Sequence, residues 1–181
     1  MKIQETPIKD CYIIHPTVFE DERGYFYEKF NEKTFEVLSG MNGHFVQDNI
    51  SKSTYGVLRG LHLQKGKHAQ AKLVSCLEGK VFDVAVDLRQ DSLTFGKWYG
   101  IELSGENKLQ FYVPRGFGHG FSVLSETAVF AYKCDNYYNK ESEGGVLWND
   151  QDLNIDWKLP EGDILLSQKD QVLPALWEKD Y

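Results

Sequence analysis

Two histidines stand in glycine-rich stretches of the chain and are the residues best suited to chemistry. His62 lies in G-V-L-R-G-L-H-L-Q, residues 56–64, and His119 lies in V-P-R-G-F-G-H-G-F, residues 113–121. A neutral imidazole binds transition metals, and the same ring exchanges protons near neutral pH. The pair therefore indicates either a metal site or an acid–base site. For His62 the alternative is a core histidine whose hydrogen bonds are satisfied by the backbone.

The stretches that carry the histidines belong to a chain rich in predicted strands. Short alternating apolar runs between turn residues favour strands at 97–103, 109–114, 120–124 and 128–135. The segment 72–89 alternates in the same way on either side of a Glu-Gly pair and predicts a β-hairpin. Its second arm is predicted to have two faces, with Phe82, Val84, Val86 and Leu88 on one and Val81, Asp83, Ala85, Asp87 and Arg89 on the other.

Helix is predicted in only two short places. The stretch N-E-K-T-F-E-V-L-S-G, residues 31–40, predicts a short helix with Asn31 as N-cap and Gly40 just past its end. Residues 167–174 predict the start of another turn. Many short strands with little helix favour an all-β sandwich or jelly roll. The length of 181 residues, without a linker or an internal repeat, predicts one domain over 1–181.

Composition narrows the class of protein. The net charge of -7 disfavours binding to nucleic acid or to an anionic membrane. The three cysteines, Cys11, Cys76 and Cys134, form no C-x-x-C motif, and their odd number favours a reducing cytoplasm over a disulfide scaffold. Cys76 lies in an apolar run and is predicted to be a buried thiol. The first ten residues lack the apolar region of a signal peptide, and no apolar run approaches the ~20 residues of a membrane span. We therefore expect a cytoplasmic protein with neither nucleic acid nor membrane as a partner.

Around the histidines the chain resembles the cupin superfamily, small jelly-roll barrels with two sequence motifs. The first motif of metal cupins is matched by Gly56 and His62, but its second histidine position holds Gln64. Lys72 stands where the glutamate ligand is expected, although after a longer gap, and the second motif, P-x-G-x-x-H, is intact at residues 114–119. A lysine ammonium has no lone pair to offer a metal. We therefore expect no metal and no other cofactor, in a pocket adapted to acid–base chemistry.

Within the cupins, nearly the whole chain resembles the dTDP-4-dehydrorhamnose 3,5-epimerase family. The motifs that carry the resemblance are F-E-D-E-R-G-Y-F-Y-E from residue 19, Q-D-N-I-S-K-S from 47, G-V-L-R-G-L-H-L-Q from 56, K-L-V-S-C-L-E-G from 72, D-V-A-V-D-L-R from 83, P-R-G-F-G-H-G-F from 114, L-W-N-D from 147 and L-S-Q-K-D from 166. The resemblance implies a jelly-roll homodimer without a cofactor. It also implies inversion at C3 and C5 of a dTDP-4-keto-6-deoxy sugar, from dTDP-4-dehydro-6-deoxy-D-glucose to dTDP-4-dehydro-L-rhamnose.

The residues agree with that reaction. A C–H bond next to a ketone is acidic because its carbanion is an enolate, so inversion needs a base on one face of the sugar and an acid on the other. His62 is the natural base. Asp170 resembles the family carboxylate that orients it, while S-Q-K-D at residues 167–170 is equally typical of a capping box at a helix start.

The acid and the groups beside the enolate oxygen come from other strands. Tyr132 resembles the family acid, although a tyrosine in such a strand is also typical of packing. Lys72 and His119 resemble the groups around the C4 oxygen, where a donor or a positive charge stabilises the developing anion. A solvated lysine at a strand end is the alternative for Lys72.

The nucleotide half of the site is assigned mainly by resemblance. Arg59 resembles a substrate-binding arginine, but it stands three residues before His62 and would point to the opposite face of a regular strand unless a bulge at Gly60 re-aims it. Arg23 resembles a diphosphate-binding arginine donated by the partner subunit. Other family positions near the sugar or the base are Phe26, Glu28, Gln47, Asp48, Asn49, Tyr138, Glu143 and Lys169, of which Tyr138 could stack on thymine.

Three alternatives stay open. A relative that epimerises only C3 of a related nucleotide 4-keto sugar would use the same residues. A metal-dependent cupin dioxygenase or isomerase is disfavoured by Gln64 and Lys72. A non-catalytic sugar-binding cupin is disfavoured because competent residues occupy the base, acid and oxyanion positions.

Overall fold

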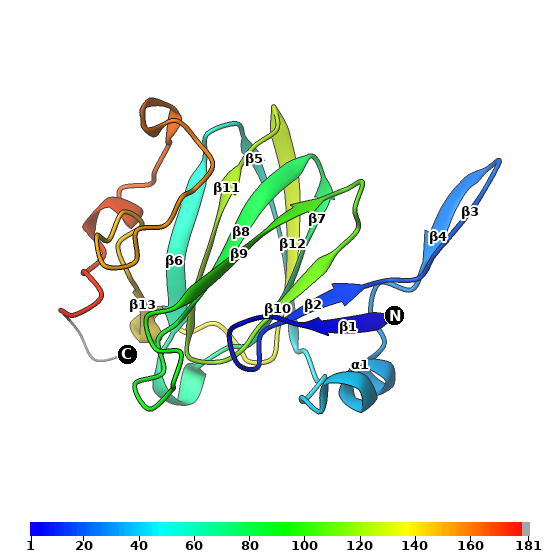
Figure 1. Ribbon diagram of the computed structural model, residues 1–181, viewed down its shortest axis with the longest axis horizontal. Coiled ribbons are helices and arrows are strands. Elements are labelled where there is room, and N and C mark those ends of the chain that lie inside the picture. Colours follow the sequence, from blue (N-terminus) through cyan, green and yellow to red (C-terminus); the bar gives the residue numbers. More distant parts are fainter. Residues whose placement is uncertain (179–181) are drawn as a thin grey trace.

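The computed structural model describes residues 1–178, so residues 179–181 of the predicted domain lie outside the described residues. Its strands form two facing antiparallel sheets and a separate two-stranded hairpin (Figure 1). The larger sheet contains, in order, β1 (Lys2–Glu5), β2 (Tyr12–His15), β10 (Gln110–Val113), β7 (Lys72–Glu78), β12 (Thr127–Cys134) and β5 (Gln47–Thr54). The smaller contains β13 (Glu143–Gly145), β6 (Leu58–Gln64), β11 (Phe117–Val123), β8 (Lys80–Asp87) and β9 (Trp98–Ser104). Two such sheets packed face to face make a jelly roll, which confirms the predicted all-β class.

The predicted hairpin at 72–89 is wrong in its pairing, because β7 and β8 belong to different sheets. Strand β7 pairs with β10 and β12, whereas β8 pairs with β11 and β9. Between them Gly79 has a φ of +73°, and a side chain there would collide with the backbone of Thr127. Glycine therefore lets the chain pass from one sheet to the other at this turn. Apolar alternation predicts that a segment is a strand, but it does not say which sheet the strand joins.

The two predicted faces of β8 are confirmed, and both are buried. Val81 and Ala85 pack into the core between the sheets, together with Phe111 and Phe130. The opposite face carries Phe82, Val84, Val86 and Leu88. These side chains pack against Leu153, Trp157 and Leu176 of the C-terminal segment, which is the part of the described chain that follows β13. The C-terminal segment therefore covers the outer face of the smaller sheet, and its turn η4 lies close to β6.

The predicted helix is confirmed as α1 (Glu32–Ser39), with both predicted caps. Asn31 Oδ1 accepts a hydrogen bond from the Thr34 N–H at 3.0 Å. Gly40 takes the left-handed conformation, with a φ of +68°, and closes the last turn. The remaining helical turns are short 3-10 elements: η1 (Gly66–His68), η2 (Lys140–Ser142), η3 (Glu161–Asp163) and η4 (Asp170–Val172). The last of these is the turn predicted within 167–174.

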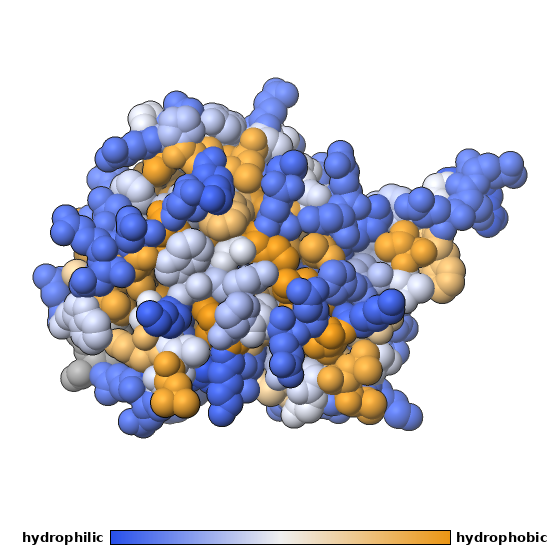
Figure 2. All heavy atoms as spheres, viewed as in Figure 1, coloured by the Kyte–Doolittle hydropathy of each residue, from blue (hydrophilic) through white to orange (hydrophobic). Residues whose placement is uncertain are grey.

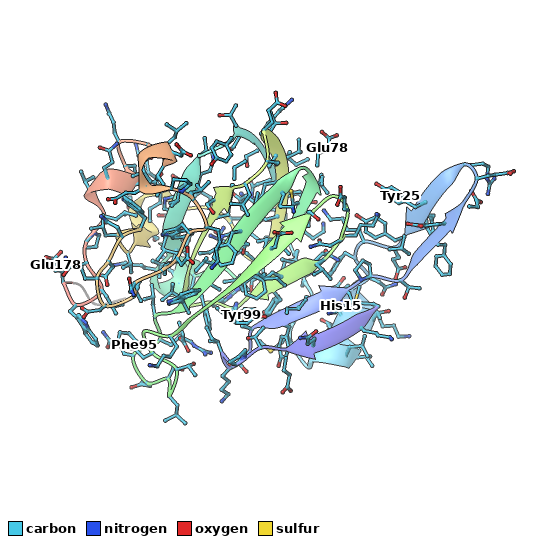
Figure 3. The ribbon with its side chains drawn as sticks, turned by 45° about the horizontal axis from the view of Figure 1, so that its top comes forward. His15, Tyr25, Glu78, Phe95, Tyr99 and Glu178 are labelled. Atoms are coloured by element: carbon cyan, nitrogen blue, oxygen red, sulfur yellow. The ribbon has the colours of Figure 1, made fainter. Side chains whose placement is uncertain are left out.

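The hairpin of β3 (Val18–Asp21) and β4 (Gly24–Tyr27), here called the arm, projects from the body (Figure 1). Figure 3 shows Tyr25 on the arm, well separated from Tyr99 on β9. The arm exposes the large apolar side chains of Phe19, Tyr25 and Phe26. Figure 2 shows hydrophobic side chains along one side of the arm and hydrophilic ones at its tip. Such an exposed apolar surface is typical of an interaction site.

All three cysteines are free thiols and are buried, as predicted for Cys76. Burial raises the pKa of Cys76 and of Cys134 to about 11, and it raises the pKa of Cys11 as well. Within residues 1–178 no helix has the length and apolar character needed to cross a membrane.

Candidate active site

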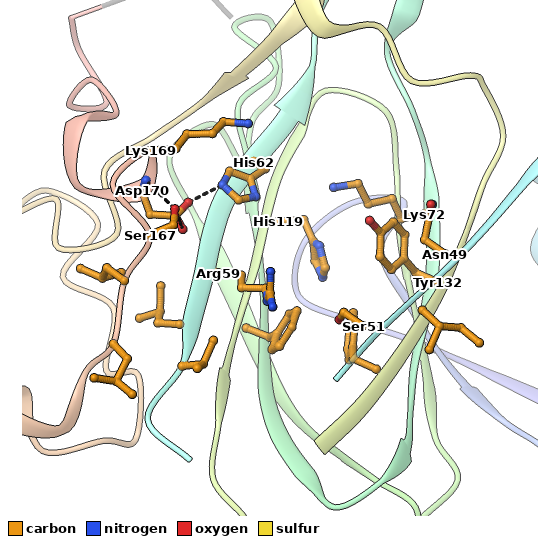
Figure 4. Close-up of a pocket in the computed structure, with 17 residues that line it drawn as sticks. Asn49, Ser51, Arg59, His62, Lys72, His119, Tyr132, Ser167, Lys169 and Asp170 are labelled. Carbon is orange, nitrogen blue, oxygen red and sulfur yellow. Dashed lines mark hydrogen bonds and ion pairs between the residues drawn. The ribbon is translucent and has the colours of Figure 1, made fainter. Parts of the chain in front are cut away.

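A cavity of about 620 Å³ opens between the two sheets and collects most of the predicted site residues (Figure 4). Its polar lining consists of Asn49 and Ser51 from β5, Arg59 and His62 from β6, Lys72 from β7, His119 from β11, Tyr132 from β12, and Ser167, Lys169 and Asp170 from the C-terminal segment. An adjoining cavity of about 130 Å³ shares several of these residues and adds Gln47, Tyr138 and Glu143. Residues separated by more than a hundred positions in the chain thus face one space.

A bulge in β6 explains how Arg59 and His62 both reach this cavity. His119 of β11 lies opposite His62, whereas Phe121, two residues on, lies opposite Arg59, three residues back. Strand β6 therefore contains one extra residue, and Gly60 takes a φ of +133° within the bulge. A β-carbon at Gly60 would come within 2.5 Å of the Gly120 α-carbon, so the close approach of the strands requires glycine there. The structure therefore contains the bulge at Gly60 that allows Arg59 and His62 to face the same cavity.

His62 is joined to Asp170 across the wall of the cavity. Its Nε2 lies 2.5 Å from Asp170 Oδ1. Asp170 is buried, and burial opposes its ionisation, but hydrogen bonds from His62 and Ser167 outweigh burial and hold the pKa of the carboxyl below its usual value. An ionised carboxylate only accepts hydrogen bonds, so Nε2 carries the hydrogen and Nδ1 keeps its lone pair. The edge of the ring turned away from Asp170 faces the cavity (Figure 4), where that lone pair can take a proton.

Asp170 contacts both His62 and the neighbouring Ser167. The Ser167 hydroxyl donates to Asp170 Oδ2 at 2.7 Å, and the Asp170 backbone N–H donates to Ser167 Oγ at 3.2 Å. Only half of the predicted capping box is present, because the Ser167 hydroxyl and not its backbone N–H reaches the carboxylate, and η4 begins at Asp170 itself with Lys169 as its N-cap. The other carboxylate oxygen is free to hold His62, so the local motif and the long-range contact do not compete.

His119 has a buried carboxylate partner that sequence reasoning missed. Its Nε2 lies 3.0 Å from both oxygens of Asp83, which is fully buried in β8. Burial lowers the pKa of His119 and of Lys72 and raises the pKa of Asp83. The available signal was an aspartate between Phe82 and Val84 in a strand, on the same face as Val81 and Ala85, because a carboxylate on an inward face needs a partner.

Tyr132 stands across the cavity from His62, with His119 and Lys72 between them (Figure 4). The Lys72 Nζ lies 6.0 Å from the centre of the Tyr132 ring. Burial raises the pKa of the Tyr132 phenol, which therefore stays protonated as a donor. A base and an acid face each other across a space that the amino group of Lys72 also reaches.

The other metal-ligand positions of the cupin motif hold groups unsuited to a metal. The Gln64 side-chain oxygen accepts a hydrogen bond from the Asn139 N–H at 2.9 Å, and Lys72 offers an ammonium group. Within the described chain no cluster of three or more His, Cys, Asp or Glu side chains could hold an ion. His62 and His119 are instead engaged with Asp170 and Asp83.

The predicted nucleotide-binding residues are only partly brought together. Lys169 Nζ pairs with Glu143 Oε2 at 2.6 Å, and Tyr138 lies exposed beside them. Gln47 and Asn49 are joined by a hydrogen bond of 3.0 Å.

Four predicted residues lie away from the cavities. Asp48 alternates with Gln47 and Asn49, so it lies on the other face of β5, where it pairs with Lys133 at 2.9 Å. Arg23, Phe26 and Glu28 lie on or just after the arm and line neither cavity within one chain. Among residues 1–178, Arg23 pairs with Asp21, two positions before it.

The two sheets and the histidine motifs at the cavity between them define a jelly-roll protein of the cupin class. A family model described as dTDP-4-dehydrorhamnose 3,5-epimerase matches residues 5–178. The chain belongs to this family.

Individual relatives agree with the match. The crystal structure of dTDP-4-dehydrorhamnose 3,5-epimerase from Elizabethkingia anophelis is 78% identical, covers 100% of this chain and 99% of its own, and superposes with a TM-score of 0.97. The epimerase of the same name from Salmonella typhimurium is 54% identical over 97% of this chain and 96% of its own. A Legionella pneumophila dTDP-6-deoxy-D-glucose-3,5-epimerase, solved in complex with dTDP-4-keto-L-rhamnose, is 54% identical over 97% of this chain and 92% of its own, with a TM-score of 0.93.

Proposed function

We propose that this protein inverts C3 and C5 of dTDP-4-dehydro-6-deoxy-D-glucose to give dTDP-4-dehydro-L-rhamnose, without a metal or another cofactor. The observation that carries the proposal is the placement of His62 and Tyr132 on opposite sides of one cavity, with Lys72 and His119 between them (Figure 4). Inversion next to a ketone needs this arrangement of base, acid and oxyanion partner. The substrate is inferred from the family to which the chain belongs and from the ligand bound to its Legionella pneumophila relative.

The first step removes the proton from C3. His62 Nδ1 takes the proton, the C–H electron pair becomes the C3–C4 double bond, and the carbonyl electron pair moves onto the C4 oxygen. Lys72 places a positive charge beside that oxygen, where one such partner is worth roughly 3–4 kcal/mol of barrier. His119 serves the same oxygen with an Nδ1–H, because the raised pKa of Asp83 favours a protonated carboxyl that donates to Nε2.

The second step returns a proton from the other face. Tyr132 donates its phenolic proton to C3, the enolate electron pair re-forms the ketone, and the carbon is inverted. Water then takes the proton from His62 and restores the one on Tyr132, so that no net proton is consumed. The same sequence at C5 completes the reaction.

The nucleotide occupies the outer part of the site in this proposal. Arg59 binds the diphosphate, for which its planar guanidinium is suited, and its Nε donates to Ser53 Oγ at 3.3 Å. The thymidine lies against Tyr138, near Gln47 and the Lys169–Glu143 pair. In this proposal Asp48 does not contact the nucleotide, because its side chain lies on the other face of β5 and pairs with Lys133.

We further propose a cytoplasmic homodimer in which the arm reaches the partner's cavity with Arg23, Phe26 and Glu28. The exposed apolar side chains of the arm and the 85% exposure of the Arg23 side chain support this. The tip would bring positive charge to a diphosphate that Arg59 alone neutralises only in part.

An isotope experiment tests the activity. The enzyme, dialysed against a strong chelator, is incubated with dTDP-4-dehydro-6-deoxy-D-glucose in heavy water, and deuterium is read at C3 and C5 separately. We expect deuterium at both carbons, an L-configured product and a rate unaffected by the chelator. Deuterium at C3 alone would assign a C3 epimerase, and none at either carbon a binding protein. A rate restored only by a particular divalent ion would contradict the metal-free mechanism.

Subunit mixing tests the shared site. Arg23→Ala and His62→Ala chains are each expected to be weakly active alone. If Arg23 serves the partner's cavity, mixed dimers contain one site with both residues intact and regain activity. Absence of recovery after subunit exchange has been verified by mass spectrometry would contradict the shared site.

A further inference from the structure

The two oxygens of the Asp170 carboxylate have different partners. Oδ1 faces His62 Nε2 at 2.5 Å, while Oδ2 accepts the Ser167 hydroxyl at 2.7 Å. The carboxylate is buried, so each oxygen that loses its donor would carry the cost of an unsatisfied polar group. Ser167 itself is exposed, so its hydroxyl is not required to fill the core.

The backbone around Asp170 gives it little support of its own. The segment is joined to β6 by hydrogen bonds between Leu165 and both Gly56 and Leu58, at 2.8 and 3.0 Å. The next backbone hydrogen bond from the segment to the body runs from the Leu147 N–H to the Pro174 carbonyl, at 2.8 Å. Asp170 lies between these two anchors, in an element of three residues. Contacts of the carboxylate itself, from the side chains of His62 and Ser167 and from the Gly60 backbone, therefore fix its rotamer.

We propose that Ser167 is a positioning residue for the catalytic base, whose hydroxyl holds Oδ2 of Asp170 and thereby presents Oδ1 to His62. The reciprocal bond from the Asp170 N–H to Ser167 Oγ sets the direction of the hydroxyl, because an oxygen that accepts from the backbone turns its hydrogen outward to the carboxylate. The inference rests on the proposed function, in which His62 is the base. It adds a third member to the His62–Asp170 pair.

The proposal predicts a particular change in Ser167→Ala. The carboxylate loses a donor and a fixed orientation, so kcat should fall about tenfold, which is the effect of about 1.4 kcal/mol on a barrier, while KM stays within about twofold. The Asp170–His62 pair would also hold a proton more tightly, because the anionic carboxylate has lost a hydrogen bond that stabilised it. The acid limb of the kcat profile should therefore move to higher pH.

Two further variants separate positioning from a general effect on the loop. Ser167→Thr keeps the hydroxyl in an exposed position with room for a methyl group, and it should restore both the rate and the acid limb. Gln168→Ala alters the exposed neighbour, which lines neither cavity, and should match the wild type. A Ser167→Ala variant with unchanged kcat and pH profile, or one that raises KM alone, would overturn the proposal.

A measurement without substrate keeps this test independent of the epimerase activity. The imidazole of His62 is titrated by NMR in the wild type, Ser167→Ala and Gln168→Ala. We expect the midpoint to rise only in Ser167→Ala. Failure of the wild type to epimerise would refute the proposed function and leave this titration valid, whereas equal midpoints in all three proteins would refute the role of Ser167.

Discussion

Two carboxylate–histidine pairs lie side by side in this protein and differ mainly in access to water. His62 and His119 are direct register partners on neighbouring strands, and each is bound through Nε2 by an aspartate. In the first pair the side chains of His62 and Asp170 are 33% and 3% exposed, and in the second those of His119 and Asp83 are 7% and 0% exposed. The same residue types therefore serve in two different environments.

The difference shows how one pair can exchange protons while the other stays fixed. Donors from His62 and Ser167 lower the pKa of Asp170 despite its burial, whereas burial dominates at Asp83 and raises its pKa. A base must lose its proton to water in every cycle, and only His62 is open enough for that. The enclosed pair is suited to holding an oxyanion, because a preorganised site away from water strengthens electrostatic interactions.

The largest expected effect comes from removing the two histidines one at a time. His62→Ala should lower kcat by about 10²–10⁴-fold and abolish deuterium exchange at C3 and C5 together, because the base is lost. His119→Ala keeps the base and should still exchange both protons, although more slowly. The comparison fails if His119→Ala loses exchange as completely as His62→Ala, as judged by NMR of the recovered sugar nucleotide.

A smaller loss is expected from removing the charge beside the enclosed pair. Lys72→Met keeps a flexible side chain of similar length but has no ammonium group, and kcat should fall about 10²–10³-fold, as for a single oxyanion partner. Lys133→Met is the matched control, since Lys133 pairs with Asp48 outside the cavity. Steady-state kinetics of the two variants would contradict the role of Lys72 if they lost similar amounts of activity.

The smallest effect concerns stability, and the two aspartates should give opposite trends with pH. The lowered pKa of Asp170 means that ionised Asp170 stabilises the fold above the unfolded-state pKa near 3.9 and that this stability is lost as the pH falls. Asp170→Asn should therefore cost about 1.5–3 kcal/mol at pH 7, and the cost should shrink only as the pH falls below about 3.9.

The raised pKa of Asp83 gives the reverse sign, since its stabilisation is present at low pH and is lost as the pH rises through the folded-state value. Asp83→Asn should thus compare more favourably with the wild type at pH 7 than at pH 4. Urea unfolding between about pH 2 and pH 8 covers both windows, below about pH 3.9 for Asp170 and above it for Asp83. Parallel trends for the two variants would show that the environments of the carboxylates are alike after all.

Local rules predicted α1 and the strands from β7 to β12, but gave no range for β1 to β5 or for β13. The helix at 31–40 was fixed by its caps, Asn31 and Gly40, which act within a single turn. Alternation located β7 to β12 because strand residues face opposite sides in turn. It failed for the pairing of β7 with β8, because the direction taken at Gly79 depends on Thr127, nearly fifty residues away.

The site was predictable where a motif carried it and not where a distant contact did. The spacing of Arg59 and His62 alone placed them on opposite faces, and a bulge at Gly60 was suggested only because the family resemblance assigned both residues to the site. Asp83 was seen only as one member of a strand face, because nothing in its neighbourhood in the sequence indicates that His119 lies opposite. The role of the arm stays a prediction, since within one chain Arg23 does not meet the cavity.

The buried thiols give the molecule an internal probe of its own motions. Cys76 lies in β7, Cys134 ends β12 beside the smaller cavity, and Cys11 Sγ donates to the Tyr112 carbonyl at 3.2 Å. Their high pKa values keep them as unreactive thiols while the strands are closed. Each can be labelled only after its own strand has opened, so three labelling rates would report three local opening free energies in one unmodified protein. A bound nucleotide sugar that protected Cys134 more than Cys11 would show that the cavity wall is tightened by its occupant.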